Sequence, residues 1–410
     1  MKTLRLACRV LLGLVFIFSG FVKGVDPMGS TIKFTEYFEV FHLTWLGSLA
    51  LILSIALSTA EFLIGVALIT GIRMKTTAWA ALIFMGFFTI LTFYSALANP
   101  VSDCGCFGDA LVITNWQTFY KNIVLSALAI IIFYQRKKYI PFSLPIIEWS
   151  LVAFFALFGT GISVYSWRHL PIVDFRPYSI GTHIPSKMVM PEGKKGDEYG
   201  TTLIYTKNGV AREFNLQNYP WQDSTWIFKE QKSYVVKKGY TIPIKSFTIS
   251  ASTGQDIGPE LLADTSYSFV FITHDMPGVK AKEWNTIKKY YSYMAGQHHK
   301  FYFVSSSTHE EAADIQKKYS LPFDIYYADQ TNLKTIMRSN PGLLLLKDGV
   351  ILGLWHYNDF PEPSYFKGNI LSIVLTDNHK TIERHGLFFV GISLLAVFSL
   401  MINYKRNGTN

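Results

Sequence analysis

Apolar residues in this chain gather in long, nearly unbroken runs instead of at the spacing of amphipathic helices or strands. Crossing a bilayer takes roughly 20 predominantly apolar residues in a helix, and six runs approach or exceed that length. They lie at 4–22, 46–70, 77–98, 119–135, 146–166 and 386–404. We therefore expect six membrane-spanning helices, and the fourth run is the shortest of them. The first run is expected to be retained, because no small-x-small cleavage site follows its basic start.

Basic residues divide unevenly between the two ends of these predicted helices. Ten of the 13 lysines and arginines outside residues 167–384 fall on the side of the two chain termini. The positive-inside rule places that side in the cytoplasm. The loops at 22–45 and 99–118 and the whole segment 167–384 are then predicted to be periplasmic. This pattern is typical of a multi-pass protein of a bacterial inner membrane. The lipid bilayer is therefore one expected binding partner.

The long polar segment is organised in two parts. Residues 167–240 read as a β-rich lead-in, with a predicted hairpin that turns at the tripeptide KNG. Over residues 241–362, apolar strands such as SYSFVFITH alternate with helical stretches such as VKAKEWNTIKKYYSYMAG, and a hairpin turning at KDG closes the segment. Alternating strands and helices predict a mainly parallel sheet with helices on both faces, to which the closing hairpin adds antiparallel strands.

Composition adds two limits to this picture. Half of the residues are hydrophobic and 16% are charged, whereas an average soluble protein is about a quarter charged. Most of the net charge of +9 comes from the residues predicted to face the cytoplasm. Residues 167–384 contribute only +3, because they contain 25 basic and 22 acidic residues. The chain has no basic patch on a soluble face and no recognisable nucleic-acid module, so we expect no nucleic-acid partner.

Two of the three cysteines lie close together in the predicted periplasmic loop 99–118. Cys104 and Cys106 flank a single glycine in the hexapeptide DCGCFG. A disulfide between residues this close is strained and therefore exchangeable, which makes the pair a redox candidate. A static disulfide that closes the loop is the alternative, and a closed zinc site has less support because it takes four ligands. Cys8, near the opposite end of the first run, is expected to be an apolar filler.

Glu61 lies inside the second predicted span, where an ionisable side chain is costly and marks a candidate functional site. Two roles stay open from the sequence: a proton relay, or a hydrogen-bonding anchor to polar side chains of neighbouring helices. At the end of the first run, small Ser19 and Gly20 favour close helix packing. Lys23 is expected to extend its ammonium group to the membrane surface.

Three segments on four predicted spans, SGFVKGVDP, STAEFLIGVALITG and DCGCFG, resemble the DoxX-like superfamily and within it the methylamine-utilisation MauE family. The resemblance covers roughly residues 1–140. It implies a four-helix membrane domain that supports disulfide formation or the maturation of periplasmic partner proteins. It also makes Cys104 and Cys106 the candidate redox pair and Glu61 a candidate membrane-site residue.

The elements of residues 241–362, with Pro341 directly before the closing hairpin, resemble a thioredoxin fold of the membrane-anchored, periplasmic kind. In that family the proline is normally cis, and a CxxC motif follows the strand that corresponds to SYSFVFITH. Here Met276 and Val279 replace both cysteines, and no cysteine follows the CxC pair, so this domain cannot exchange disulfides with its own residues. A groove formed by Met276, Pro277, Val279 and Pro341 is expected to accept an extended peptide by strand addition. A scaffold without a ligand is the alternative.

These observations predict an α-helical membrane bundle joined to an α/β, thioredoxin-like soluble domain. The expected units are 1–140, a fifth span at 146–166, the lead-in 167–240, the thioredoxin-like domain 241–362 and a sixth span at 386–404. The leading hypothesis is an inner-membrane protein that supports extracytoplasmic thiol–disulfide chemistry or the maturation of envelope proteins, with a membrane thiol–disulfide oxidoreductase as the candidate enzyme class. Its CxC pair exchanges electrons at the membrane surface with a quinone as candidate acceptor, and its cysteine-less domain holds a periplasmic protein.

Two other functions compete with this hypothesis. The first is a non-catalytic anchor or assembly factor of an envelope complex, with a structural CxC disulfide. The second is transport centred on Glu61, which has less support because one carboxylate without an intramembrane partner makes a poor permeation path.

Overall fold

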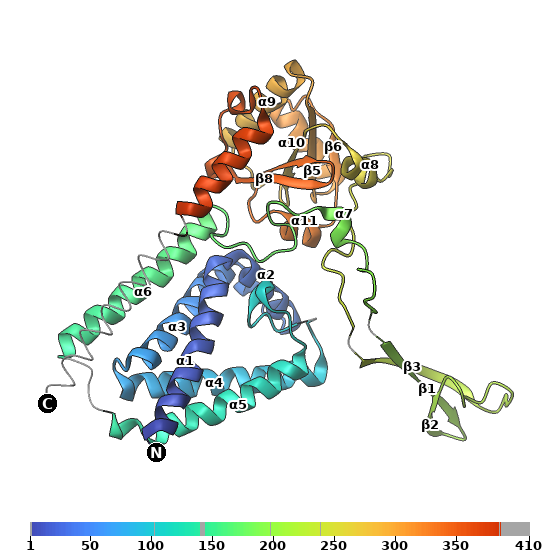
Figure 1. The fold of residues 1–410 in the computed structure, drawn as a ribbon. Helices are drawn as coiled ribbons and strands as arrows, with labels where there is room; N and C mark the ends of the chain where they lie inside the picture. The colour runs from blue at the N-terminus through green and yellow to red at the C-terminus, as the bar shows by residue number, and fades with distance from the viewer. Residues whose placement is uncertain are drawn as a thin grey trace.

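A computed structural model describes residues 2–384 except 102, 140–143, 197 and 238, and it also describes residue 386. Helices make up most of the first 168 residues, and two β-sheets follow them (Figure 1). Within the described residues, five helical segments are long and apolar enough to cross a membrane. These involve α1 (Lys2–Val25), α3 (Ala50–Thr70) with the 3-10 helix Thr44–Leu49 before it, α4 (Met74–Ala98), α5 (Asn115–Tyr134) and α6 (Pro145–Arg168).

Five of the six predicted spans are therefore confirmed as helices. Local signals set their ends: Gly71, at φ +86°, ends α3, and the Thr114 hydroxyl caps α5 by accepting a hydrogen bond from the Gln117 backbone N–H. Apart from residue 386, the sixth predicted span at 386–404 lies outside the described residues and stays a prediction. A helix over residues 370–384 precedes it.

The segment between the first two spans, predicted as a loop, contains the helix α2 (Pro27–Val40). Asp26 caps this helix, because its side chain accepts a hydrogen bond of 2.9 Å from the Gly29 backbone N–H, and Pro27 occupies the first turn. This helix was not predicted, because α2 mixes polar and aromatic residues and so has no long apolar run. The helix packs against α3 at one end of the bundle (Figure 1).

Helices α1 and α3 cross closely because glycines line the crossing. A Cβ atom added at Gly20 would lie 2.4 Å from the backbone nitrogen of Phe62, and one added at Gly65 would lie 2.6 Å from that of Ile17. This approach confirms the packing role predicted for Gly20. It also brings polar side chains of the two helices into direct contact.

The larger sheet has the strand order β6-β5-β4-β7-β8 and lies above the end of the bundle where α2 is found (Figure 1). The sheet and the helices around it form the larger sheet's domain. It consists of α7 (Ile184–Lys187), α8 (Gly258–Ala263), β4 (Ser268–Thr273), α9 (Ala281–Gly296), β5 (Lys300–Ser305), α10 (His309–Tyr319), β6 (Ile325–Tyr327), α11 (Gln330–Ile336), β7 (Gly342–Lys347) and β8 (Val350–His356). Strand β5 pairs in parallel with β4 and β6, whereas β7 pairs antiparallel with β4 and β8. The sheet is therefore mixed, not mainly parallel, because the closing hairpin supplies half of its pairings.

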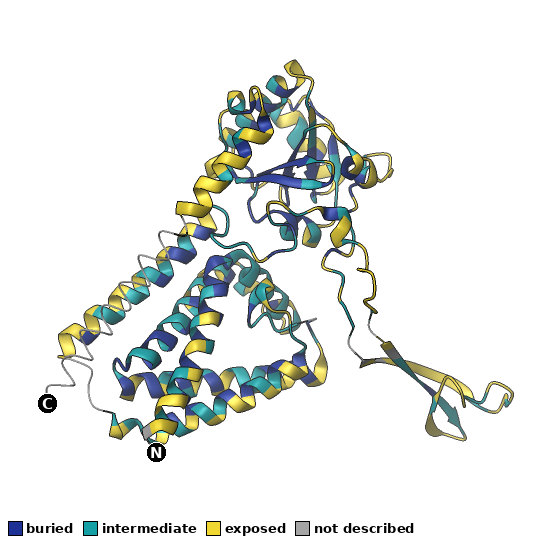
Figure 2. Cartoon of the chain, in the orientation of Figure 1, coloured by how far each residue is buried: buried dark blue, intermediate teal, exposed yellow. Residues whose placement is uncertain are grey.

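Both faces of this sheet are covered, and Figure 2 shows its strands as buried between more exposed helices. Successive residues of β4 point to opposite faces. Phe269 and Phe271 join the apolar cluster that contains Trp284 of α9, and Val270 and Ile272 join the cluster on the other face. The helix cover predicted from the alternating pattern is thus confirmed.

The smaller sheet has the order β2-β1-β3, from β1 (Glu198–Lys207), β2 (Val210–Asn215) and β3 (Ile227–Lys237). The predicted KNG hairpin is confirmed, because Lys207 pairs with Val210 and both turn residues have positive φ, +52° at Asn208 and +78° at Gly209. This sheet projects away from the bundle and from the larger sheet on two connecting segments (Figure 1).

Candidate functional site

The Cys104–Cys106 pair lies in the loop between α4 and α5, beside α2. The two sulfurs are 3.0 Å apart and both residues are half-buried. Gly105 between them has φ +65°, and a Cβ atom there would lie 2.9 Å from Cγ of Lys33. Only glycine suits this position, because the loop bends in the left-handed region directly beneath the Lys33 side chain. Asp103 fixes the same bend by accepting a hydrogen bond of 2.9 Å from the Gly105 N–H.

The two thiols differ in acidity. The hydrogen bond with Cys104 lowers the pKa of Cys106 to about 6; burial opposes this shift, whereas Lys121 and Lys23 add to it. The same hydrogen bond, together with burial, raises the pKa of Cys104 well above its usual value. At neutral pH the arrangement is therefore a Cys104 thiol that donates to a Cys106 thiolate. A thiolate is the nucleophilic form of cysteine and also the better leaving group.

Alkylation of Cys106 should follow this acidity. We expect half of its maximal rate with iodoacetamide near pH 6, because the thiolate dominates above that pH and is lost as the pH falls below it. Cys104→Ala removes the hydrogen-bond donor, so the half-maximal pH should rise toward ~8.5. Cys104→Ser keeps a donor and serves as the matched control, with a half-maximal pH that stays low. Mass spectrometry of the modified peptide measures each rate, and equal profiles for the two variants would contradict the assignment.

Glu61 forms a buried ion pair with Lys23 next to residues 99–114, the loop between α4 and α5 that is called the Cys loop from here on. The Lys23 Nζ lies 2.6 and 2.8 Å from the two carboxylate oxygens, and the side chains are only 8% and 4% exposed. The Ser19 hydroxyl lies 2.8 Å from one of these oxygens. The expectation that Lys23 extends to the membrane surface was therefore wrong. Its ammonium group turns inward because the buried carboxylate supplies a counter-charge within reach.

Ser19 connects this ion pair to the Cys loop. Its Oγ lies 2.8 Å from the carbonyl oxygen of Cys106 and 3.1 Å from Nζ of Lys23. The hydroxyl accepts from the ammonium group, and its single proton serves either the Glu61 carboxylate or the Cys106 carbonyl. Of the two roles left open for Glu61, these contacts support the anchor between helices, and the proton relay stays a prediction.

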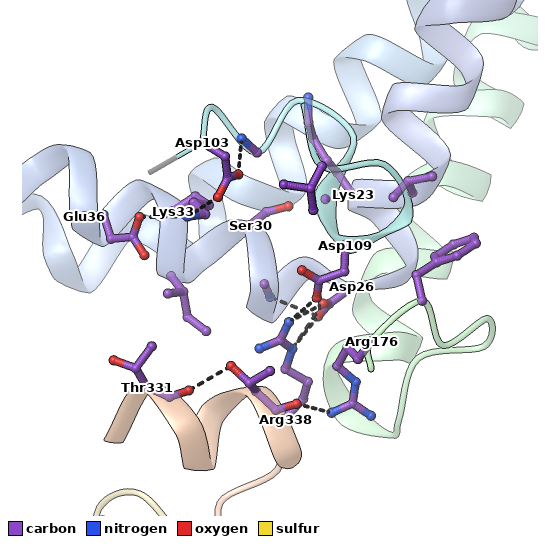
Figure 3. Close-up of a pocket in the computed structure, with 18 residues that line it drawn as sticks. Lys23, Asp26, Ser30, Lys33, Glu36, Asp103, Asp109, Arg176, Thr331 and Arg338 are labelled. Carbon is purple, nitrogen blue, oxygen red and sulfur yellow. Dashed lines mark hydrogen bonds and ion pairs between the residues drawn. The ribbon is translucent and has the colours of Figure 1, made fainter. Parts of the chain in front are cut away.

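Among the described residues, three cavities reach the Cys loop, and the smallest, of about 40 Å³, lies beside Cys106 and Glu61. The two larger ones differ in their linings. One, of about 670 Å³, lies among α2, α3 and α4, has almost entirely apolar walls and reaches both Cys104 and Cys106. The other, of about 170 Å³, lies between the bundle and α11 and is lined by many charged side chains (Figure 3). Lys23, Lys33 and Gly105 line both cavities, so the Cys loop lies on the boundary between an apolar cavity and a more charged one.

Arg338 joins the larger sheet's domain to the Cys loop. Its Nη2 lies 2.8 Å from a carboxylate oxygen of Asp26, at the start of α2, and 2.9 Å from one of Asp109, in the Cys loop (Figure 3). Burial alone would raise the pKa of Asp26, but Arg338 and Arg176 more than offset this and lower it. Sequence reasoning missed this contact because Arg338 and Asp26 are 312 positions apart.

The four residues predicted to line a peptide groove do not form an open one. Met276 and Val279 are 0% and 4% exposed and belong to the core cluster, Pro341 is also buried, and Pro277 is exposed. Both side chains are apolar and pack in the same cluster as Trp284 of α9. The bond before Pro341 is cis, as the resemblance implied, and the preceding Asn340 accepts a hydrogen bond from the His274 N–H. Peptide binding at this place stays a prediction.

Two parts of the chain match known protein families. Residues 199–238, which contain most of the smaller sheet, match a family described as "Domain of unknown function (DUF8463)". No curated protein matches the chain. Residues 1–135, which carry the first four spanning helices and the Cys loop, match the family described as "Methylamine utilisation protein MauE". The chain is thus a multi-pass membrane protein whose residues 1–135 form a MauE family domain.

Proposed function

We propose that this protein oxidises thiols of a partner protein on the outer side of the inner membrane, with Cys104 and Cys106 as its redox pair. The observation that carries the proposal is the pair itself: two half-buried sulfurs 3.0 Å apart, one of which has a pKa lowered to about 6. A reduced form stabilised in this way makes the corresponding disulfide a stronger oxidant. This favours the oxidising direction over the reducing one.

The chemistry is a thiol–disulfide exchange in two steps. A partner thiolate attacks Cys104 of the Cys104–Cys106 disulfide, because Cys106, the more acidic thiol, is then the leaving group. A second partner thiolate attacks the partner sulfur of this mixed disulfide and releases Cys104, which takes up a proton. The partner gains one disulfide bond and loses two electrons, and the redox pair gains both of them.

The proposal places the Cys loop and both sheets in the periplasm and both chain termini in the cytoplasm. The distribution of basic residues supports this orientation. It also treats residues 241–362 as a thioredoxin-like domain that positions the partner, within a DoxX-like protein. The five-stranded mixed sheet with an apolar cluster on each face supports that fold. The absence of cysteines from this segment favours a binding role over exchange.

Trapping of mixed disulfides tests this function. Cys106→Ser keeps Cys104, the cysteine that is joined to the partner in the mixed disulfide, but lacks the thiol that would displace the partner again. Its Cys104 thiolate can attack the disulfide of an oxidised partner, which reverses the second step, so this variant should accumulate a covalent adduct on non-reducing gels. Cys104→Ser should accumulate far less. Cys8→Ser, a change at a buried thiol in the apolar cluster of α1, is the control and should leave the redox state of the pair unchanged. A pair that keeps one redox state in cells under both oxidising and reducing growth would refute the proposal.

A non-catalytic anchor with a static disulfide is the competing function. The burial of Met276 and Val279 favours it, because these side chains offer no open surface to a partner. In that case Cys104→Ser and Cys106→Ser should both leave function intact, whereas deletion of residues 241–362 should abolish it.

A further inference from the structure

The apolar cavity beside the Cys loop opens toward the region that lipid would occupy. Ile83 and Phe87 of α4 line it and are themselves 65% and 62% exposed. The other walls come from aromatic and aliphatic residues such as Phe34, Phe38 and Leu57. Since α4 is one of the candidate spans, a molecule dissolved in the bilayer has a direct entrance.

The polar groups of this cavity gather at its Cys end. Lys33 lies against Gly105, the Tyr37 hydroxyl interacts with the Cys104 thiol, and Lys23 is held beside Ser19. A ligand that fills the cavity is therefore largely apolar and carries its polar group at the end where the two sulfurs lie. A polar electron acceptor such as a dinucleotide does not fit, because its charged groups would be unpaired among phenylalanine side chains.

We propose that this cavity binds a lipid-soluble quinone, which reoxidises the Cys104–Cys106 pair. The inference rests on the proposed function, in which each turnover leaves the pair reduced. Cys104 and Cys106 then form one S–S bond and give two electrons to the quinone. The quinone also takes up two protons, one of them from Cys104 and one from solvent at neutral pH, and leaves as the quinol. A volume of about 670 Å³ is within the range of small-molecule sites.

Direct oxidation of the purified protein tests the inference. The full chain in lipid nanodiscs is reduced with dithiothreitol, freed of reductant under anaerobic conditions and mixed with decylubiquinone. We expect one quinol per protein molecule, followed by ultraviolet absorbance, and the loss of two alkylatable thiols. Cys106→Ser should produce no quinol.

Two matched variants on α4 locate the reaction. Ile83 and Ile90 are both exposed isoleucines, at 65% and 73%, but only Ile83 is among the residues that line the cavity. Ile83→Trp narrows the entrance, so the rate with decylubiquinone, divided by the rate with soluble glutathione disulfide, should fall about tenfold, as for a misfit of one small group in an apolar pocket. Ile90→Trp should leave this ratio unchanged.

The outcomes separate the two proposals. If glutathione disulfide oxidises the pair but decylubiquinone does not, the quinone site is wrong and the thiol chemistry stands. If neither reagent oxidises the pair, the proposed function itself is wrong. A cavity that retains only a phospholipid acyl chain in native mass spectrometry, with no quinol formed, also overturns the inference. If the ratio of the decylubiquinone rate to the glutathione disulfide rate were the same for both tryptophan variants, the reaction would not take place in this cavity.

Discussion

Replacing Lys23 by methionine should destabilise the helical bundle by about 3–5 kcal/mol, the usual cost of breaking a buried ion pair by removing one partner. Glu61 is 3% exposed, and Lys23 supplies its only counter-charge among the ion pairs of the described residues. Ser19 would remain as a hydrogen-bond donor to the carboxylate. A single neutral donor does not compensate a buried negative charge, so the loss should be large.

Unfolding in mixed detergent micelles, followed by circular dichroism, measures this cost. Lys75→Met is the matched control, because Lys75 is exposed at the start of α4; we expect a change within about 0.5 kcal/mol. The double variant Lys23→Met, Glu61→Met removes both charges and should recover most of the lost stability. If the double variant were as unstable as the sum of its single changes, the ion pair would not be the source of the effect.

The membrane spans were predictable because their cause is local. A helix that crosses lipid must satisfy its own backbone hydrogen bonds and present apolar side chains over its whole length. The run at 119–135 was the shortest of the six, yet α5 extends from Asn115 to Tyr134, because its first turn is polar and capped by Thr114. The same locality applies to the hairpin turn at Asn208 and Gly209, whose positive φ angles are available to asparagine and glycine.

The partner of Glu61 was not predictable from either helix by itself. Lys23 at a helix end reads as a surface residue, and its inward turn depends on the close crossing of α1 and α3 at Gly20 and Gly65. One signal was present: a carboxylate within a span requires a cation or proton nearby. Lys23 lies at the end of the neighbouring apolar run, one helical turn after Ser19.

The groove predicted around Met276 and Val279 had less support in the sequence than the membrane spans had. Resemblance of element order predicts where Met276 and Val279 lie along the chain, but the replacement of both cysteines also changes which environment the side chains prefer. Their apolar character indicated burial, and both residues pack in the core with Trp284.

The start of α2 was marked in the sequence by Asp26 and Pro27, a cap and first-turn pair that a search for apolar runs alone does not detect.

Replacing Arg338 by methionine should release the larger sheet's domain from the Cys loop. Arg338 is 8% exposed and contacts two carboxylates, those of Asp26 and Asp109. Without the guanidinium group, Asp26, whose side chain is 16% exposed, keeps the neutral Gly29 N–H as a hydrogen-bond donor but loses the cation beside it. Truncating one partner of a buried charge pair costs about 2–5 kcal/mol, and we expect this cost to weaken the contact between the two parts of the chain.

The released domain should expose the Cys loop to large reagents. We expect Cys104 and Cys106 of Arg338→Met to react with a polyethylene-glycol maleimide at least about tenfold faster, since 1.4 kcal/mol of weakened contact already corresponds to that factor. Hydrogen exchange should increase in α11 and in residues 99–114. Lys334→Met, in α11 just before Arg338, is the control; it keeps the backbone carbonyl that Arg338 contacts. If both variants shield the cysteines as the unmodified protein does, Arg338 does not hold the domain in place. If only Arg338→Met exposes them, the domain without cysteines controls which partners reach the redox pair.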